Sequence, residues 1–540
     1  MKSCPLCHRT YLDETLNFCL DDGSGLLEGP ATAEQRTATS PNASHGTGGL
    51  SVTPSAVHDF PTQVLWAGAP LTSGIANSIA VLPFANISRD ENIEYFSDGL
   101  AEELLNVLSK IRGVQVAART SAFSFKGKST TIPEIGQILN VASIVEGSIR
   151  MVGERIRIAV QLVNVTDGFQ LWSETYDRTM DDIFAVQDDI AQSVLEEIRT
   201  RFEGEENREK VSKKVISEVA EAVRGRASDP EAQRLMLLGR YFLDRTTRDD
   251  TTKAIGYFQQ ALRLDPTFAL CWAELGRAFS VEAGRGWSDV RAGYSRSRDA
   301  ALRAVALEPA LAEGHAQLGR IQIAHDWDWK GADASYKKAL ELAPGNSSVL
   351  DGASVLMYKL GRLDEALDLA RRVLAQDPLS AAFWHNLGLI SHAAGLLNES
   401  EQAYRRALEL APQRIVSGSL LSLVLMDEGR IDEAFKQSKL EPDEFWRLWA
   451  QAILFSAAKK KDEAEKSLEL IREKFEDGNA YQIAEIYAAS GKIDDAFDWL
   501  DRAFKQRDPG VTHARVNPRF KPLHEDTRWT DLLLKIGLDQ

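Results

Sequence analysis

Hydrophobic and polar positions change their period along the chain, and the periods predict two kinds of structure. Between residues 75 and 202, short apolar runs predict strands, which we place at 78–84, 114–117, 142–151, 155–165 and 169–177. Apolar residues at helical spacing predict helices over 97–110, 132–139 and 183–202. The tetrapeptide 152–155 between two of the strands is typical of a hairpin turn. We therefore expect residues 75–202 to form one mixed α+β domain.

A regular repeat follows over residues 230–540. Its units end in prolines, which cannot continue a helix, at Pro266, Pro309, Pro344, Pro378 and Pro412. The last three intervals are 35, 34 and 34 residues, and the first, at 43, holds an insertion. A period of about 34 residues is the signature of the tetratricopeptide repeat, a helix–turn–helix unit. We predict an all-α solenoid of about eight hairpins between 232 and 507, followed by a C-terminal cap that ends at 529–533.

The unit that begins at Ala381 illustrates the packing expected within one hairpin. Gly388 on the first helix leaves room for the second helix to approach, and Tyr404 on that second helix points into the seam. We therefore expect small and aromatic positions of this kind to meet between the paired helices.

Two further segments lack the patterns of a packed core. Residues 28–74 are rich in Gly, Pro, Ser, Thr and Ala without sustained periodicity, which is typical of a flexible linker. Residues 203–229 are densely charged and helix-prone, and we expect a helical connector rather than part of a core.

Several short motifs resemble those of one bacterial family that joins tetratricopeptide repeats to a domain like the N-terminus of TolB. The motifs are IAVLPF at 79–84, YFSDGL at 95–100, EGSIR at 146–150, LWSETYD at 171–177, DDIFAVQ at 181–187, DWDW at 326–329 and DPLS at 377–380. The resemblance covers roughly 460 residues and implies a TolB-N-terminal-like domain at 75–202. In that family the module is often fused to an adenylate cyclase, a protein kinase or a winged-helix regulator. We expect none of these effector domains here, because the leading module is small.

That leading module, residues 1–27, contains the strongest candidate for bound chemistry. Cys4 and Cys7 form a Cys-x-x-Cys turn that can hold zinc, and Cys19 with Asp22 occupies the place of a second zinc knuckle. The module resembles small zinc ribbons, although Asp22 stands where the fourth cysteine would be. We expect a structural Zn²⁺ site whose fourth ligand is Asp22 or His8. A ribbon that has lost its metal remains open, and a redox role is disfavoured because the thioredoxin-type context is missing.

Charge narrows the classes of partner. The chain carries 63 Lys and Arg against 79 Asp and Glu, a net charge of −16. This excess of acid argues against broad binding to nucleic acid and against a polybasic membrane surface. The first thirty residues are also acidic, so protein contact is the better hypothesis for the ribbon. No signal-peptide-like or membrane-spanning apolar run is present, and we expect a cytoplasmic protein.

The repeats contain a pattern of arginines. Three units carry Leu-Gly-Arg on their first helix, ending in Arg240, Arg277 and Arg320. The position after that glycine tends to line the concave groove, so these arginines are candidates for a ladder that binds an acidic segment or a C-terminus, because guanidinium forks suit carboxylates. The alternative is local pairing with acids such as Glu274 and Glu313.

His385 and His392 are seven residues apart on one helix and add two candidate groove residues, without a further metal ligand nearby. No His-Glu-x-x-His or Gly-x-Ser-x-Gly motif occurs, so we expect neither an enzyme nor a small-molecule substrate. The sequence favours a non-enzymatic scaffold that recruits protein partners through the solenoid groove, in bacterial signalling or regulation. The alternative is a transcription or signalling regulator whose ribbon contacts nucleic acid or polymerase.

Overall fold

The chain divides into two compact units, Met1–Pro70 and Leu71–Gln540. The structure, a computed structural model, describes residues 77–88, 91–111, 113–152, 155–179, 183–203, 207–245 and 247–539, and three short strands of the first unit. These strands are β1 (Lys2–Ser3), β2 (Thr10–Tyr11) and β3 (Leu27–Glu28), which form an antiparallel sheet in the order β2-β1-β3. Cys4, Cys7, His8, Cys19, Asp22 and most of the expected linker lie outside the described residues, so the zinc site stays a prediction.

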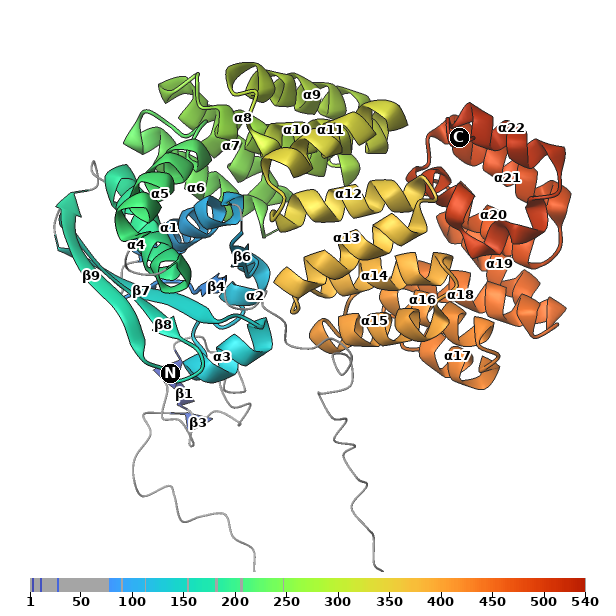
Figure 1. Cartoon of the computed structure of the whole chain (residues 1–540). Coiled ribbons are helices and arrows are strands. Elements are labelled where there is room, and N and C mark those ends of the chain that lie inside the picture. The colour runs from blue at the N-terminus through green and yellow to red at the C-terminus, as the bar shows by residue number, and fades with distance from the viewer. Residues whose placement is uncertain are drawn as a thin grey trace, which may run out of the picture. The chain divides into compact units, whose positions relative to one another are not determined.

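The second unit begins with a six-stranded mixed sheet, ordered β6-β4-β7-β8-β9 with β5 also paired to β7 (Figure 1). The strands are β4 (Ser78–Val81), β5 (Ala85–Asn86), β6 (Gln115–Val116), β7 (Ser143–Val152), β8 (Arg155–Asn164) and β9 (Gln170–Thr179). β4 and β6 are parallel, as are β4 and β7, whereas β7, β8 and β9 are antiparallel. The α+β pattern predicted for this stretch is confirmed.

Helices cover both faces of this sheet. Helices α1 (Glu91–Lys110), α4 (Ile183–Glu203) and α5 (Arg208–Ala222) share one apolar core with the alternate residues of β8, including Ile156 and Ile158. Helix α3 (Ile132–Leu139) packs on the other face near β4 and β7. A short helix, α2 (Arg119–Phe123), follows β6.

The segment 203–229 differs from the expectation of a connector outside the core. Helix α5 places Val211, Val215 and Val219 four residues apart, and all three are buried in the core beneath the sheet. Charged residues occupy the remaining faces of the helix and dominate its composition. For that reason the composition alone did not indicate the apolar stripe. The mixed α+β domain, which we call the α/β domain below, therefore extends to Ala222.

The described residues from 230 to 507 form eight helical hairpins, as the repeat predicted. The pairs are α6 (Pro230–Leu243) with α7 (Arg248–Leu264), α8 (Ala269–Gly284) with α9 (Val290–Leu307), α10 (Ala312–Ile321) with α11 (Trp329–Leu342), α12 (Ser347–Lys359) with α13 (Leu363–Gln376), α14 (Ala381–Ala393) with α15 (Leu397–Leu410), α16 (Ser417–Asp427) with α17 (Ile431–Ser438), α18 (Glu444–Ala457) with α19 (Lys461–Phe475), and α20 (Ala480–Ala489) with α21 (Ile493–Gln506). A Cβ on Gly388 would lie 2.9 Å from the ring of Tyr404, which confirms the close approach expected within the hairpin. We call the surface formed by the first helices of the hairpins the groove.

The C-terminal segment, residues 508–539, folds back onto this groove. It consists of η5 (Pro509–Val516), η6 (Pro518–Leu523) and α22 (Thr527–Lys535). η5 packs on α12 and α20, and η6 packs on α20. Nε1 of Trp329, at the start of α11, donates a hydrogen bond to the carbonyl of Ile536 at 2.7 Å. The segment thus joins the third, fourth and eighth hairpins (Figure 1). Across the described residues, no helix is long and apolar enough to cross a membrane.

Candidate binding site between the α/β domain and the solenoid

Helix α1 packs directly on the first helix of the solenoid, α6. The contact is close because α1 presents Gly99 there, where a Cβ would lie 2.9 Å from Cδ1 of Leu237. Ile111 and Val114, which follow the end of α1, are buried in the sheet core. Helix α1 is therefore anchored in the domain while its other face meets the groove.

Helix α2 attaches the domain to the solenoid at a second point, the turn between α13 and α14. The amide of Ala118 donates to the carbonyl of Gln376 at 2.7 Å. The hydroxyl of Ser121 donates to the carboxylate of Asp377 and accepts from the amide of Leu379 at 2.9 Å. Ser121 and Asp377 are both buried, so α2 is held by satisfied polar contacts as well as by packing.

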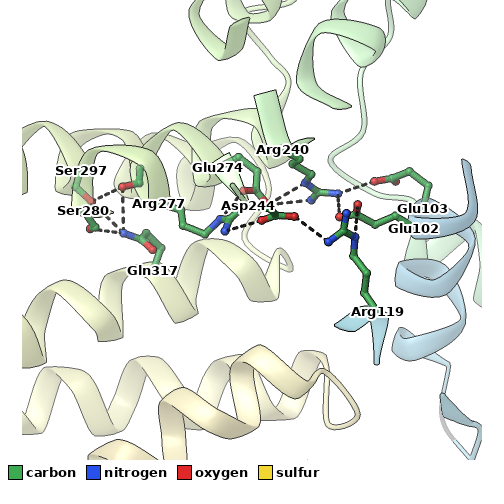
Figure 2. Close-up of polar contacts among 11 residues, drawn as sticks. Glu102, Glu103, Arg119, Arg240, Asp244, Glu274, Arg277, Ser280, Ser297 and Gln317 are labelled. Atoms are coloured by element: carbon green, nitrogen blue, oxygen red, sulfur yellow. Dashed lines mark hydrogen bonds and ion pairs between the residues drawn. The ribbon is translucent and has the colours of Figure 1, made fainter. Parts of the chain in front are cut away.

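Between these two points lies a buried ion-pair network centred on Arg240 of α6 (Figure 2). Its guanidinium donates to Glu103 of α1 at 2.7 Å and to Glu274 of α8 at 3.0 Å, and lies 3.7 Å from Glu102. Only 7% of the Arg240 side chain and 2% of the Glu103 side chain are exposed. A buried charge is tolerated when it is paired in this way, and these pairs join α1 of the domain to α6 and α8 of the solenoid.

The network sets the ionisation of its members. Burial alone would lower the pKa of Arg240, but the carboxylates of Glu274, Glu103 and Glu102 outweigh it and raise that pKa. Burial would raise the pKa of Glu274, but Arg277 and Arg240 outweigh it and lower the pKa to about 2. The pKa of Glu102 is raised by burial, which its arginine neighbours offset only in part. Arg240 and Glu274 are therefore charged at neutral pH.

Towards the solvent the network continues through Arg277 and Arg119. Arg277 donates to Glu274 at 2.8 Å and lies 3.5 Å from Asp244, while Arg119 of α2 lies 2.9 Å from Glu102 and 3.0 Å from Asp244. About a third of each arginine side chain is exposed. Arg240 is thus buried and paired with acids of its own chain, which is the alternative to the arginine ladder. Arg277 is paired with acids of the chain as well, but part of its side chain remains exposed.

A cavity of about 740 Å³ opens beside this network, between α1 and α2 on one side and the first helices of the first five hairpins on the other. Among the residues that line it are Arg119, Arg277, Glu313, Arg320, Asn346 and Phe383. Glu313 lies 3.3 Å from Lys110 of α1, so it is already paired. Arg320, the third arginine of the pattern, is exposed, and its guanidinium makes no hydrogen bond or ion pair with any described residue.

Arg320 is carried by a rigid element. One turn before it on α10, the buried amide of Gln317 donates to Ser280 at 2.7 Å and to Ser297 at 3.0 Å (Figure 2). These bonds join α10 to both helices of the preceding hairpin. They hold the backbone that presents Arg320 to the cavity, while its exposed guanidinium can still accept a ligand.

The two candidate groove histidines, His385 and His392, lie on α14, the first helix of the fifth hairpin. Nδ1 of His385 is 2.8 Å from the hydroxyl of Ser417, and burial, with Arg414 nearby, lowers the pKa of His385 to about 3. Nε2 of His392 is 2.7 Å from the carboxylate of Asp427, which also pairs with Arg519 of η6. His392 therefore lies at the part of the groove that the C-terminal segment contacts. It lines a cavity of about 510 Å³ there.

Sequence reasoning named Glu274 as a possible local partner of the arginines, but it missed the acids Glu102, Glu103 and Asp244 and the cation Arg119. One signal was present: Glu103 lies between Leu100 and Leu104, both buried, so an acid shares the apolar face of α1. An acid on such a face requires a buried partner. No group of three or more potential metal ligands occurs among the residues that the structure describes.

Comparison with known proteins agrees with the repeats. Residues 356–415 match a family model described as tetratricopeptide repeat. "Putative adenylate cyclase 3" of Rhizobium meliloti (strain 1021) is 37% identical over 199 residues, 37% of this chain and 32% of that protein. "Cellulose synthase operon protein C" of Pseudomonas fluorescens (strain SBW25) is 26% identical over 194 residues, 33% of this chain and 15% of that protein. The chain spans about a third of the length of the first relative and less of the second.

Solved structures give partial overlaps. The structure of pilF from Pseudomonas aeruginosa matches with a TM-score of 0.32 at 19% identity, over 39% of this chain and 92% of that one. The human IFIT1 dimer with m7Gppp-AAAA matches with a TM-score of 0.38 at 15% identity, over 60% of this chain and 88% of that one. The family match and the eight hairpins together show that tetratricopeptide repeats form the C-terminal region.

Proposed function

We propose that the protein is a non-enzymatic adaptor that binds a partner protein in the cavity between its α/β domain and its tetratricopeptide repeats. The partner presents an acidic segment or a C-terminal carboxylate to Arg320. Stacked helical hairpins suit this role because they create an extended concave surface for binding.

The observation that carries the proposal is the contrast between Arg320 and the other two arginines of the pattern. Arg240 is saturated by carboxylates of the chain, and Arg277 is bonded to Glu274, whereas Arg320 lines the cavity with no hydrogen bond or ion pair to a described residue and only a longer-range electrostatic interaction with the carboxyl of Asp351. An arginine fork binds a carboxylate through charge-assisted, often bidentate hydrogen bonds. The lining also contains acids such as Glu102 and Glu313, which repel an incoming carboxylate. The carboxylate of a partner therefore has one favourable position in the cavity, beside Arg320.

The remainder of the groove supports the same location. The C-terminal segment covers α12, α20 and the side chains of His392 and Asp427, and its Phe520 and Leu523 are fully buried. Exposing a fully buried apolar side chain to water costs about 1.5–3 kcal/mol. A partner would have to displace that segment to reach the surface beneath it, whereas the cavity beside Arg320 needs no such displacement. The cavity of about 510 Å³ at His392 is also open, but its arginine, Arg519, is already paired with Asp427.

The relative named as an adenylate cyclase supports a role in bacterial signalling, since it shares 199 aligned residues with this chain. In the proposed adaptor, the α/β domain forms one wall of the binding cavity and contributes Arg119 to it. The activity of the partner would then supply the signalling output.

The test is a charge reversal at the cavity with a matched reversal elsewhere. Arg320→Glu in the full chain is compared with Arg303→Glu, because Arg303 is an exposed arginine on the second helix α9 and does not line the cavity. Proteins captured from a bacterial lysate by the wild type should be retained by Arg303→Glu, lost with Arg320→Glu, and displaced by excess hexaglutamate peptide. Equal capture by the two variants, with both folded by circular dichroism, would refute the proposal.

A further inference from the structure

Strand β9 ends the sheet of the α/β domain, and its outer edge is long. It runs over ten residues, Gln170–Thr179, and among the described residues no strand pairs with the edge opposite β8. Figure 1 shows β9 at the outer border of the domain. An open edge presents unpaired backbone donors and acceptors that can bind another strand.

The edge has few of the features that prevent pairing. Folded proteins protect such edges with charged side chains (lysine above all), prolines, bulges or short strands, and over most of β9 the charged side chains are the only such feature present. β9 contains no proline, lysine or glycine, and its one irregularity of register, opposite Leu162 and Val163, lies at its beginning. From Ser173 to Thr179 the strand is regular, and every side chain except Tyr176 is exposed.

The charges along this edge are complementary to themselves. Glu174 and Arg178 are both exposed and lie two residues on either side of Tyr176. Within the chain, Arg178 donates to the backbone carbonyl of Asp177, and Glu174 accepts from the hydroxyl of Tyr176, so neither is in a salt bridge with a described residue. Antiparallel pairing of two copies centred on Tyr176 places Glu174 of each copy opposite Arg178 of the other.

Neighbouring registers are less favourable. Centring the pair on Glu174 or on Asp177 would place two like charges directly opposite each other, which destabilises cross-strand pairs. Centring it on Thr175 would avoid like charges but would form no ion pair. The register centred on Tyr176 instead gives two ion pairs on one face, and on the other face it brings Thr175 opposite Asp177, where a hydroxyl can donate to a carboxylate.

We propose that β9 pairs with β9 of a second copy of this chain, so that the two sheets continue into one across a two-fold axis. The occupant of the edge is the second copy because the charge pattern of β9 is complementary to itself in that register. The dimer presents two binding cavities, which raises the avidity for a partner that is itself dimeric or repeated.

The experiment is sedimentation velocity of the full chain with charge variants at the edge. The wild type should show a concentration-dependent dimer, and Arg178→Glu or Glu174→Arg should each weaken it by about tenfold or more, because each creates two like-charge pairs. The double variant Glu174→Arg with Arg178→Glu should restore the dimer, since the pairs are then reversed in sign.

A matched control is Arg150→Glu on β7, which is exposed but lies two strands inside the edge. It should dimerise like the wild type. A wild type that remains monomeric up to about 100 µM, within the micromolar to millimolar range in which unpaired strand edges associate, would overturn the proposal. So would single variants that dimerise as well as the wild type, or a double variant that fails to recover.

Discussion

The three arginines of the Leu-Gly-Arg pattern show how residues in equivalent positions acquire different roles. Arg240 is on the hairpin that meets α1, and it is buried among Glu103, Glu274 and Glu102. Arg277 is one hairpin further along, and a third of its side chain is exposed. The repeat fixes where each arginine points, and the α/β domain decides which of them is buried.

This difference predicts unequal effects of the same substitution. Arg240→Met should lower the free energy of unfolding by about 3 kcal/mol, because it removes the buried cation that bonds Glu103 and Glu274. Arg226, at 3.6 Å from Glu103, and Arg277, beside Glu274, replace that cation only in part. Arg277→Met should cost about 1 kcal/mol or less, because its ion pairs are partly solvated. Urea unfolding of both variants measures the difference, and equal losses would contradict a buried docking network.

At the same scale, the sequence was sufficient for one half of the candidate site. The spacing of the repeats located Arg240, Arg277 and Arg320, but the partner of Arg240 on α1 is 137 positions away. Spacing within a helix carries no information about contacts across that separation. The sequence did contain one indication of this contact. Glu103 is an acid on the apolar face of α1, and a buried acid needs a cation beside it.

At the scale of elements, long periodic segments were predictable and short aperiodic ones were not. The predicted helix 132–139 and the predicted strands 142–151 and 155–165 agree closely with α3, β7 and β8. Helix α2 is five residues long, too short to show a helical period, although it bonds the domain to the solenoid through Ser121. The η5 and η6 helices were likewise missed, because their positions are set by docking on the groove.

Two buried ionisable groups lie where η5 and η6 pack on α12 and α20, and neither has an opposite charge in direct contact. Lys359 donates to the hydroxyl of Thr512 and lies 3.1 Å from His513, and burial lowers the pKa of Lys359 to about 7. Glu485 accepts from Asn517 at 2.5 Å, and burial raises the pKa of Glu485 to about 8. Between those two pKa values, both groups are therefore largely neutral in the folded chain.

These shifts predict opposite dependences of stability on pH. Glu485 has an ordinary pKa of 4.5, so the folded state binds the extra proton between pH 4.5 and about 8, and this contribution to stability is lost as the pH rises through that window. Lys359 has an ordinary pKa of 10.5, so the unfolded state binds the extra proton between about 7 and 10.5, and stability is gained as the pH rises there. Each effect is of the order of a few kcal/mol.

Urea unfolding at pH 5, 8 and 10 measures both contributions. Glu485→Gln should become more stable relative to the wild type between pH 5 and 8, and Lys359→Met should become less stable relative to the wild type between pH 8 and 10. Glu444→Gln is the control, because Glu444 is an exposed partner of Lys474. Differences that do not change with pH would show that the two buried groups do not titrate on unfolding.

At the scale of the second unit, contacts between distant parts of the chain replace the purely neighbour-to-neighbour order of a repeat array. In a simple solenoid each repeat contacts only the repeats beside it. Here the α/β domain joins the first hairpin to the turn between α13 and α14 through Arg240 and Ser121. The C-terminal segment joins the eighth hairpin to the third through Trp329, 207 residues before its bonding partner. Unfolding should therefore be more cooperative than in an open array.

Two tryptophans allow a matched test of this cooperativity. Nε1 of Trp329 donates to the carbonyl of Ile536, and Nε1 of Trp384 donates to the carbonyl of Pro378, only six residues before it, at 2.8 Å. Replacing either with Phe keeps an aromatic ring and removes one hydrogen bond, worth about 1 kcal/mol or about a fivefold change in an opening equilibrium. Trp329→Phe should speed amide hydrogen exchange in both the C-terminal segment and the third hairpin. Trp384→Phe should speed exchange only around α14, and a Trp329→Phe effect confined to α11 would show that the long-range contact does not couple the two ends.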